Sequence, residues 1–106
     1  MVWNELKSVE EWNGLLQSEG KFIVFKHSTR CSISTTALSR FERDWDATST
    51  VKPYYLDLLE HRNISNAIAQ DTGVEHESPQ AILIENGKVL KSATHLSIYV
   101  SDLLEA

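Results

Sequence analysis

The chain has 106 residues, of which 42% are hydrophobic and 24% charged, and this composition fits a single domain over residues 1–106. The formal net charge is −5 and the Lys and Arg residues are scattered, which argues against a nucleic-acid partner. No apolar run approaches the roughly 18 residues that a membrane span requires, and the N-terminal residues do not resemble a signal peptide, so we expect a cytoplasmic protein with no membrane partner.

The N-terminal part of the chain predicts a short strand, a helix and a buried strand. The short strand falls at residues 2–6. Ser8 is a candidate N-cap because Glu11 follows it as in a capping box, and apolar residues at helical spacing continue until Gly20. Residues 21–26 form an apolar block bounded by lysines and rich in β-branched and aromatic residues, which is typical of a central strand covered on both faces.

A second helix is predicted after this strand. Ser28 and Thr29 are residue types that cap helices, and beyond them apolar residues recur at spacings of three and four. The apolar residues are Ile33, Ala37, Leu38, Phe41 and Trp45. The pattern predicts a helix from near Cys31 to about Trp45 that packs its apolar stripe into the core.

The middle of the chain repeats the strand and the helix. Residues 54–59 follow Pro53 and have the composition of a strand. From Asn63 onward a third apolar stripe runs to Gly73, and glycine is a common helix stop. Strand, helix, strand and helix in this order favour parallel strands joined by crossover connections.

The C-terminal third predicts a hairpin and a last helix. Residues 80–84 and 88–93 flank Asn86-Gly87, a dipeptide that favours a tight turn between antiparallel strands. Residues 96–104 carry enough apolar side chains for a terminal helix, with Ser97 as its cap. Taken in order, the elements fit the thioredoxin fold, an α/β architecture in which a central mixed sheet is flanked by helices on both faces.

Cys31, the only cysteine, is the first candidate functional residue. In this fold it follows a central strand and lies at the first turn of a helix, where free backbone N–H groups and the helix dipole favour thiolate over thiol. Arg30 is adjacent and permanently charged, so it is a candidate for tuning the sulfur. The alternative is an inert, buried cysteine. A single cysteine also excludes a disulfide framework and agrees with a reducing compartment.

Cys31 and Ser34 form a C-x-x-S motif, in which serine stands where a C-x-x-C motif has its second cysteine. Positions i and i+3 share one helix face, so the Ser34 hydroxyl can donate a hydrogen bond to the thiolate. A hydroxyl cannot attack a mixed disulfide, so an external small thiol has to regenerate Cys31. The motif therefore predicts monothiol exchange chemistry, with Cys31, Arg30 and Ser34 as the catalytic candidates.

Ser78 and Pro79 immediately precede the strand predicted at residues 80–84. In thioredoxin-like folds a cis-proline occupies this place beside the cysteine, and the residue before it presents its backbone to an extended substrate. Both isomers of the Ser78–Pro79 bond are compatible with the sequence. We expect Ser78 and Pro79 to bind substrate, and we refer to these two residues as the docking ledge.

Residues 25–34, with Ser78-Pro79 and Asn86-Gly87 downstream, resemble the YtxJ-type bacilliredoxins, which are monothiol thioredoxin-like proteins of the bacillithiol system. The resemblance covers essentially the whole chain, and its most specific part is the segment His-Ser-x-x-Cys-x-Ile-Ser. Proline often follows the cysteine in that family, whereas Ser32 stands here and leaves the start of the helix less rigid.

The resemblance implies a function for the cysteine. Cys31 would be the nucleophile of an oxidoreductase that reduces mixed disulfides between proteins and bacillithiol. Bacillithiol would be the co-substrate thiol, and bacillithiolated proteins would be the partners. Thr29 and Ser32, which lie next to the cysteine motif, are further candidates for substrate binding.

Other residues have simpler interpretations. We expect His27 to be a strand-end residue that hydrogen-bonds the backbone rather than a proton-transfer group. His61, His76 and His95 lack metal-ligand spacing with one another or with Cys31, so no metal site is expected. A function of another class stays open, namely a redox-inactive thioredoxin-like module that binds a peptide on the docking ledge.

Overall fold

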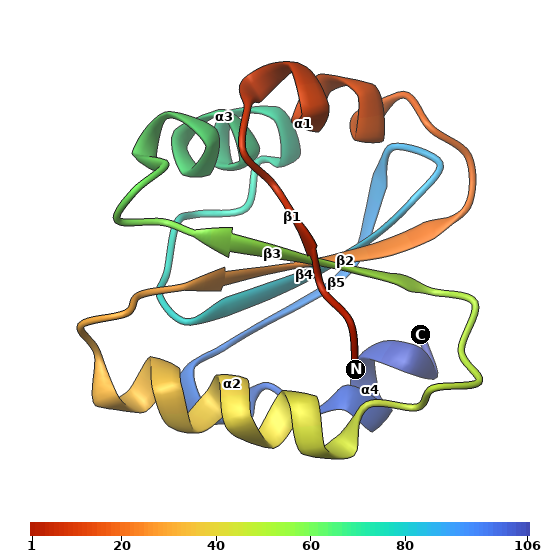
Figure 1. The fold of residues 1–106 in the computed structure, drawn as a ribbon. Coiled ribbons are helices and arrows are strands. Elements are labelled where there is room, and N and C mark those ends of the chain that lie inside the picture. Colours follow the sequence, from red (N-terminus) through yellow and green to blue (C-terminus); the bar gives the residue numbers. More distant parts are fainter.

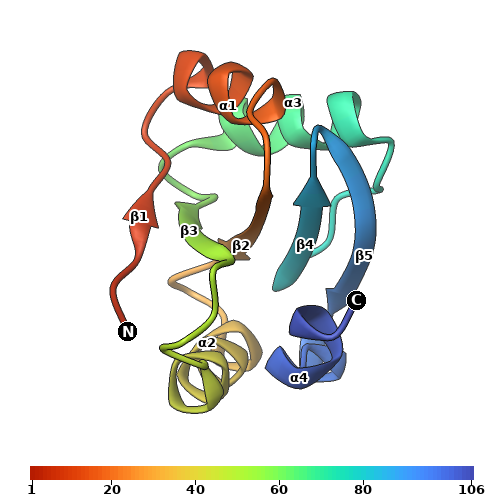
Figure 2. The ribbon, with the colours of Figure 1, turned by 90° about the vertical axis from the view of Figure 1, so that its right-hand side faces the viewer.

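The computed structural model describes residues 1–106 as a five-stranded sheet between two layers of helices (Figure 1). In chain order the elements are β1 (Asn4–Glu5), α1 (Val9–Leu16), β2 (Lys21–His27), α2 (Ser32–Asp44), β3 (Lys52–Asp57), α3 (Arg62–Thr72), β4 (Gln80–Glu85), β5 (Lys88–Thr94), the 3-10 helix η1 (His95–Ser97) and α4 (Val100–Leu104). Helices α1 and α3 cover one face of the sheet, and α2 and α4 cover the other (Figures 1 and 2). None of the helices is long and apolar enough to cross a bilayer.

The sheet has the strand order β1-β3-β2-β4-β5, with β2 at its centre. Strands β1, β3 and β2 run parallel, whereas β4 is antiparallel to both β2 and β5. The predicted crossovers and the predicted hairpin are therefore confirmed. Asn86 and Gly87 form the hairpin turn with φ of 50° and 78°. A side chain at position 87 would place its Cβ 2.6 Å from the Leu16 carbonyl oxygen, so the turn requires glycine.

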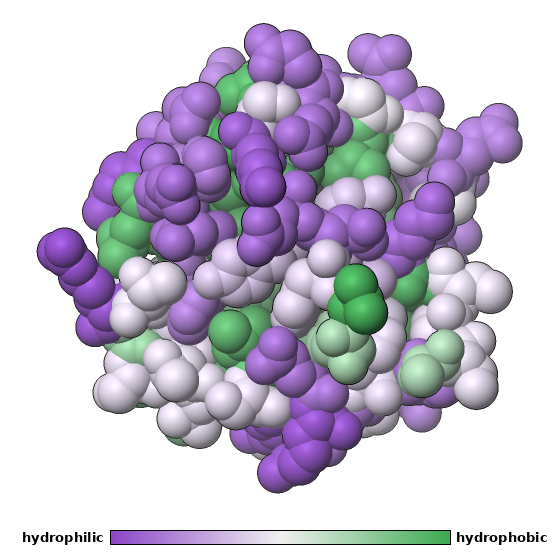
Figure 3. All heavy atoms as spheres, in the orientation of Figure 1, coloured by the Kyte–Doolittle hydropathy of each residue, from purple (hydrophilic) through white to green (hydrophobic).

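Strand β2 is apolar on both faces because each face has its own core. Ile23 and Phe25 belong to the core beneath α2 and α4, and Phe22 and Val24 belong to the core beneath α1 and α3. Phe41 of the predicted α2 stripe is buried in the first of these cores. On the outside, the face seen in Figure 1 is covered mainly by hydrophilic and intermediate residues, and its hydrophobic residues are scattered (Figure 3).

Two predicted helix ends are confirmed by their hydrogen bonds. Ser8 is the N-cap of α1, and its Oγ accepts the Glu11 N–H at 3.1 Å. Gly73 ends α3 in the left-handed conformation with φ of 71°, and its N–H donates to the Ala69 carbonyl. The end of α1 was predicted too far along the chain: the helix stops at Leu16, before Gly20.

The prediction of one continuous C-terminal helix capped by Ser97 is wrong. Residues 95–97 form a 3-10 helix, Ile98 is extended and buried, and α4 begins only at Val100. Arg40 of α2 donates hydrogen bonds of 2.6 and 2.9 Å to the carbonyl groups of residues 96 and 98. These long-range contacts hold the segment in a non-helical path.

The sequence suggested that Lys26, which follows the apolar block, ends the central strand, but it does not. Strand β2 continues to His27, and the side chain of Lys26 is completely buried. The Lys26 Nζ donates to the Ser65 carbonyl of α3 at 3.2 Å. A lysine is therefore accommodated inside the sheet because a helix carbonyl accepts from it.

Candidate active site

The predicted site residues gather at one end of the sheet, where β2 ends and β4 begins. His27 is the last residue of β2, and the antiparallel register pairs Lys26 with Gln80 at the start of β4. The docking ledge directly precedes Gln80, and its Ser78–Pro79 peptide bond is cis. The same register places the ledge beside the chain that leaves β2 toward Cys31.

Cys31 is the N-cap residue of α2 and is only half-buried. A turn over residues 28–31 brings it there, with the Cys31 N–H donating to the Ser28 carbonyl at 3.2 Å. Ser28 and Thr29 were the predicted cap residues, but the N-cap of α2 is Cys31. The Cys31 side chain makes no capping hydrogen bond. Cys31 thus stands at the start of a 13-residue helix, where backbone N–H groups have no partner within the helix.

Ser34 does not make the hydrogen bond to the Cys31 sulfur that the C-x-x-S spacing allows. Its side chain is completely buried, and its Oγ accepts the Ser28 N–H at 3.0 Å and lies 2.7 Å from His27 Nδ1. The Ser34 hydroxyl therefore fastens the first turn of α2 to the end of β2. This contact holds in place the turn that carries Cys31.

His27 is bound through its ring to a side chain, rather than to the backbone as expected. Burial lowers the pKa of His27, and the negative charges of Asp57 and Glu42 oppose this effect more weakly. The imidazole is therefore neutral at neutral pH, and its hydrogen bond to Ser34 is one between uncharged groups. The sequence signal that could have found this pair is a histidine followed seven residues later by the serine of the cysteine motif.

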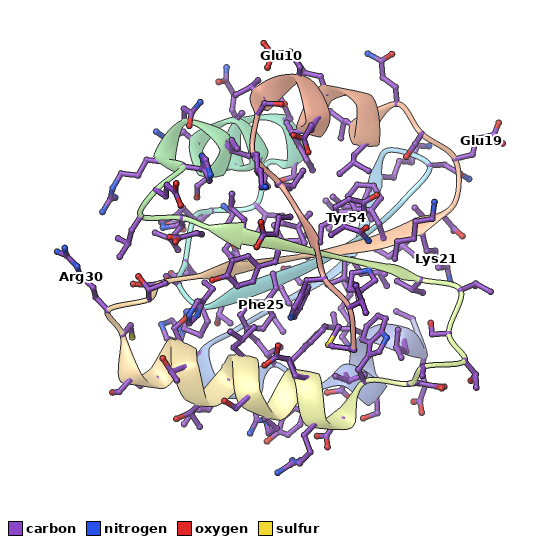
Figure 4. The ribbon with its side chains drawn as sticks, in the orientation of Figure 1. Glu10, Glu19, Lys21, Phe25, Arg30 and Tyr54 are labelled. Atoms are coloured by element: carbon purple, nitrogen blue, oxygen red, sulfur yellow. The ribbon has the colours of Figure 1, made fainter.

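The structure does not bring the Arg30 guanidinium to the sulfur. Arg30 is exposed, and its side chain projects outward from the end of the molecule (Figure 4). Thr29 and Ser32 are exposed on either side of the same turn. The turn after β2 exposes its side chains to solvent, so these residues lie beside Cys31 in the sequence but make no hydrogen bond to its sulfur.

The docking ledge carries polar groups without partners inside the chain. The N–H and the carbonyl of Ser78 form no backbone hydrogen bond, and its Oγ is buried without a partner. Pro79 is buried, and its carbonyl accepts the His95 N–H at 2.9 Å. Ser78 therefore has a free donor and free acceptors for an extended segment of another molecule.

A polar cluster near the ledge, buried except for His76, was missed from the sequence. It consists of Lys26, Ser65, His76 and Gln80, which come from two strands, α3 and the loop after α3. The sequence signal that could have indicated this cluster is Lys26, a lysine at an inward position of a central strand. No group of three His, Cys, Asp or Glu side chains lies close enough together to hold a metal ion.

Comparisons with known proteins agree with this geometry. A family model described as "Monothiol bacilliredoxin BrxC" matches residues 4–103. A solved structure described as a candidate oxidoreductase with a thioredoxin fold is 34% identical, with a TM-score of 0.79 over 95% of this chain and 89% of that chain.

Two more distant structures show the fold alone. The thioredoxin from Trypanosoma brucei brucei is 17% identical, with a TM-score of 0.75 over 98% of this chain and 86% of that chain. The oxidised thioredoxin from Plasmodium falciparum is 12% identical, with a TM-score of 0.76 over 98% of this chain and 96% of that chain. The predicted thioredoxin-like fold is thus confirmed.

Proposed function

The chain belongs to the monothiol bacilliredoxin family, and from this premise we propose that it is a cytoplasmic thiol–disulfide oxidoreductase that removes bacillithiol from bacillithiolated proteins. One observation carries the proposal: the single cysteine is accessible at the N-cap of α2, with a serine in place of a resolving cysteine. A thiolate in this position can attack a disulfide but has no intramolecular partner to release the product.

The reaction consists of two exchange steps. The Cys31 thiolate attacks the bacillithiol sulfur of the mixed disulfide, and the client cysteine leaves as a thiolate that takes a proton from water. Cys31 now carries bacillithiol in a disulfide. A second bacillithiol thiolate attacks this adduct, forms bacillithiol disulfide and releases the Cys31 thiolate. In sum, the mixed disulfide and one free bacillithiol give the client thiol and bacillithiol disulfide, so one disulfide bond is exchanged for another and free bacillithiol is the reductant.

The surroundings of Cys31 suggest how the other candidates act. The free N–H and carbonyl of Ser78 pair with the client backbone next to its modified cysteine. Thr29 and Ser32 contact the bacillithiol moiety from the exposed turn. Arg30 attracts this anionic thiol through its charge at long range and does not touch the sulfur. Ser34 acts as a positioning residue.

Two exposed apolar side chains support docking of a protein client. Ile33, in the first turn of α2, is 44% exposed, and Leu96 of η1 is 50% exposed. Helix α2 packs against η1, so both residues belong to the same side of the sheet as Cys31. They offer apolar contact area to a polypeptide that lies on the docking ledge.

The proposal is tested by incubating the reduced protein with the disulfides of bacillithiol, glutathione and coenzyme A at equal concentration. Intact mass should show one adduct on Cys31, formed from bacillithiol disulfide at least about tenfold faster than from the others, a difference of about 1.4 kcal/mol in barrier. Equal rates for the three reagents would contradict the choice of bacillithiol. Peptide binding without any adduct would favour the redox-inactive binding module.

A further inference from the structure

A polar cluster lies at the loop that joins α3 to β4, and the exchange chemistry does not use it. Its Lys26 and Ser65 are buried, whereas His76 lies exposed at its edge. Lys26 of β2 is completely buried, and its Nζ donates to the Ser65 carbonyl at 3.2 Å. The same Nζ lies 3.4 Å from Nδ1 of His76, and the Ser65 Oγ lies 3.1 Å from that nitrogen. His76 belongs to the loop, so the cluster joins the loop to the sheet and to α3.

The contacts define the protonation state of His76. A lysine ammonium only donates, so a hydrogen bond from Lys26 Nζ requires a lone pair on Nδ1 of His76 and leaves the ring proton on Nε2. Burial lowers the pKa of His76, and the neighbouring Lys26 lowers it further. Burial also lowers the pKa of Lys26 to about 8. A neutral imidazole that accepts from a lysine ammonium is therefore the arrangement at neutral pH.

The loop is fastened immediately before the docking ledge. Gln80 is buried, and its Nε2 donates to the Glu75 carbonyl at 2.9 Å. His76 is fastened by the contacts to Lys26 and Ser65. Ser78, by contrast, has no hydrogen bond of its own within the chain. Ser78 is thus held on one side by the contacts made at residues 75 and 76, and on the other by the buried Pro79, whose carbonyl accepts the His95 N–H.

We propose that Lys26, Ser65 and His76 form a polar clamp that positions the docking ledge for the protein part of the mixed disulfide. This inference rests on the proposed function. The three residues act through the loop and not on the sulfur, so they determine how well a client docks rather than how fast Cys31 reacts. They are positioning residues.

Protonation of His76 opens the clamp. With a proton on Nδ1, the ring no longer accepts from Lys26, and two positive charges face each other. Arg62 at the start of α3 adds a repulsive charge, and Glu77 in the loop adds an attractive one. Because the pKa of His76 lies below its ordinary value of 6.5, the clamp is closed at neutral pH and opens as the pH falls below that value.

The first test uses His76→Ala with a bacillithiolated client protein. Loss of the hydrogen-bonded clamp should raise KM about fivefold and change kcat by less than about twofold, because binding is lost equally in the ground and transition states. Alkylation of Cys31 by iodoacetamide should keep its rate. His76→Asn, whose amide oxygen can accept in place of Nδ1, should restore KM. The matched control is His61→Ala, which removes a histidine that makes no side-chain hydrogen bond.

Further readouts separate the clamp from a general loss of stability. In His76→Ala and in Lys26→Met, which keeps most of the buried stem, amide exchange of Val74 and His95 should be faster than in the wild type, because their N–H groups donate to Thr72 Oγ1 and to the Pro79 carbonyl. The wild-type KM should rise below pH 6.5, and this rise should be absent in His76→Asn. The exchange measurement needs no substrate, so it still decides the clamp if the wild type fails to reduce the client. Unchanged exchange, or a KM of His76→Ala within about twofold of the wild type, overturns the proposal.

Discussion

The Cys31→Ser variant is expected to lose all catalysed reduction of bacillithiolated protein while keeping its fold. The chain has no second sulfur to take over the exchange, and a serine hydroxyl is not a nucleophile toward disulfides at neutral pH. The Cys31 side chain makes no hydrogen bond that the substitution would break. Serine is also a favourable N-cap, so the free energy of unfolding should be unchanged or raised by up to about 1 kcal/mol.

The measurement is release of bacillithiol from a client protein, followed by intact mass, together with urea unfolding of both proteins. The matched control is Ser39→Ala, an exposed position on the same helix and away from the cysteine, which should keep the wild-type rate. Turnover by Cys31→Ser at the wild-type rate would end the proposed function. Loss of folding in that variant would instead show that the sulfur has a structural role.

The Ser34→Ala variant is expected to lose about 2–6 kcal/mol of unfolding free energy, because two buried polar groups are left without a partner at about 1–3 kcal/mol each. The groups are the Ser28 N–H and Nδ1 of His27, both of which contact the Ser34 Oγ. Ser32→Ala is the matched control, since it removes an exposed hydroxyl in the same turn and should change stability by less than about 0.5 kcal/mol.

Urea unfolding and the iodoacetamide rate together decide what Ser34 does. The structure assigns it to fastening α2 onto β2, so the variant should be less stable. If Ser34 instead bound the thiolate, as the C-x-x-S motif suggested, stability would hardly change and alkylation of Cys31 would change markedly. The two interpretations of this serine therefore give opposite results.

Local patterns sufficed for those parts of the fold that depend on neighbouring residues. The capping box at Ser8, the stop at Gly73 and the turn at Asn86-Gly87 each involve a backbone requirement that residues within a few positions satisfy. The predicted central strand was correct because a strand buried on both faces has a continuous apolar pattern.

The errors fall where distant residues decide the local conformation. Residues 96–104 have the apolar content of a helix, but Arg40 of α2 binds two of their backbone carbonyls and keeps Ile98 extended. Lys26 looked like the polar end of a strand, yet a carbonyl of α3 accepts its ammonium group. Neither partner can be identified from the spacing of nearby residues.

The candidate site shows the same division. The place of Cys31 at the start of a helix and the neighbouring ledge followed from the order of the elements. The direction of individual side chains did not: Arg30 projects into solvent, and the Ser34 hydroxyl contacts His27. The i, i+3 spacing predicts that Ser34 lies near Cys31 on one helix face, but it does not determine which hydrogen bonds the buried Ser34 hydroxyl makes.

The central claim is that Cys31 itself receives bacillithiol from a client protein. A stoichiometric mixture of the reduced protein and a bacillithiolated client, without free bacillithiol, tests this most directly by intact mass over time. The client should lose the mass of bacillithiol while this chain gains it on Cys31, with no further turnover until bacillithiol is added. A client that stays modified while Cys31 stays unmodified would show that Cys31 is not the acceptor of bacillithiol.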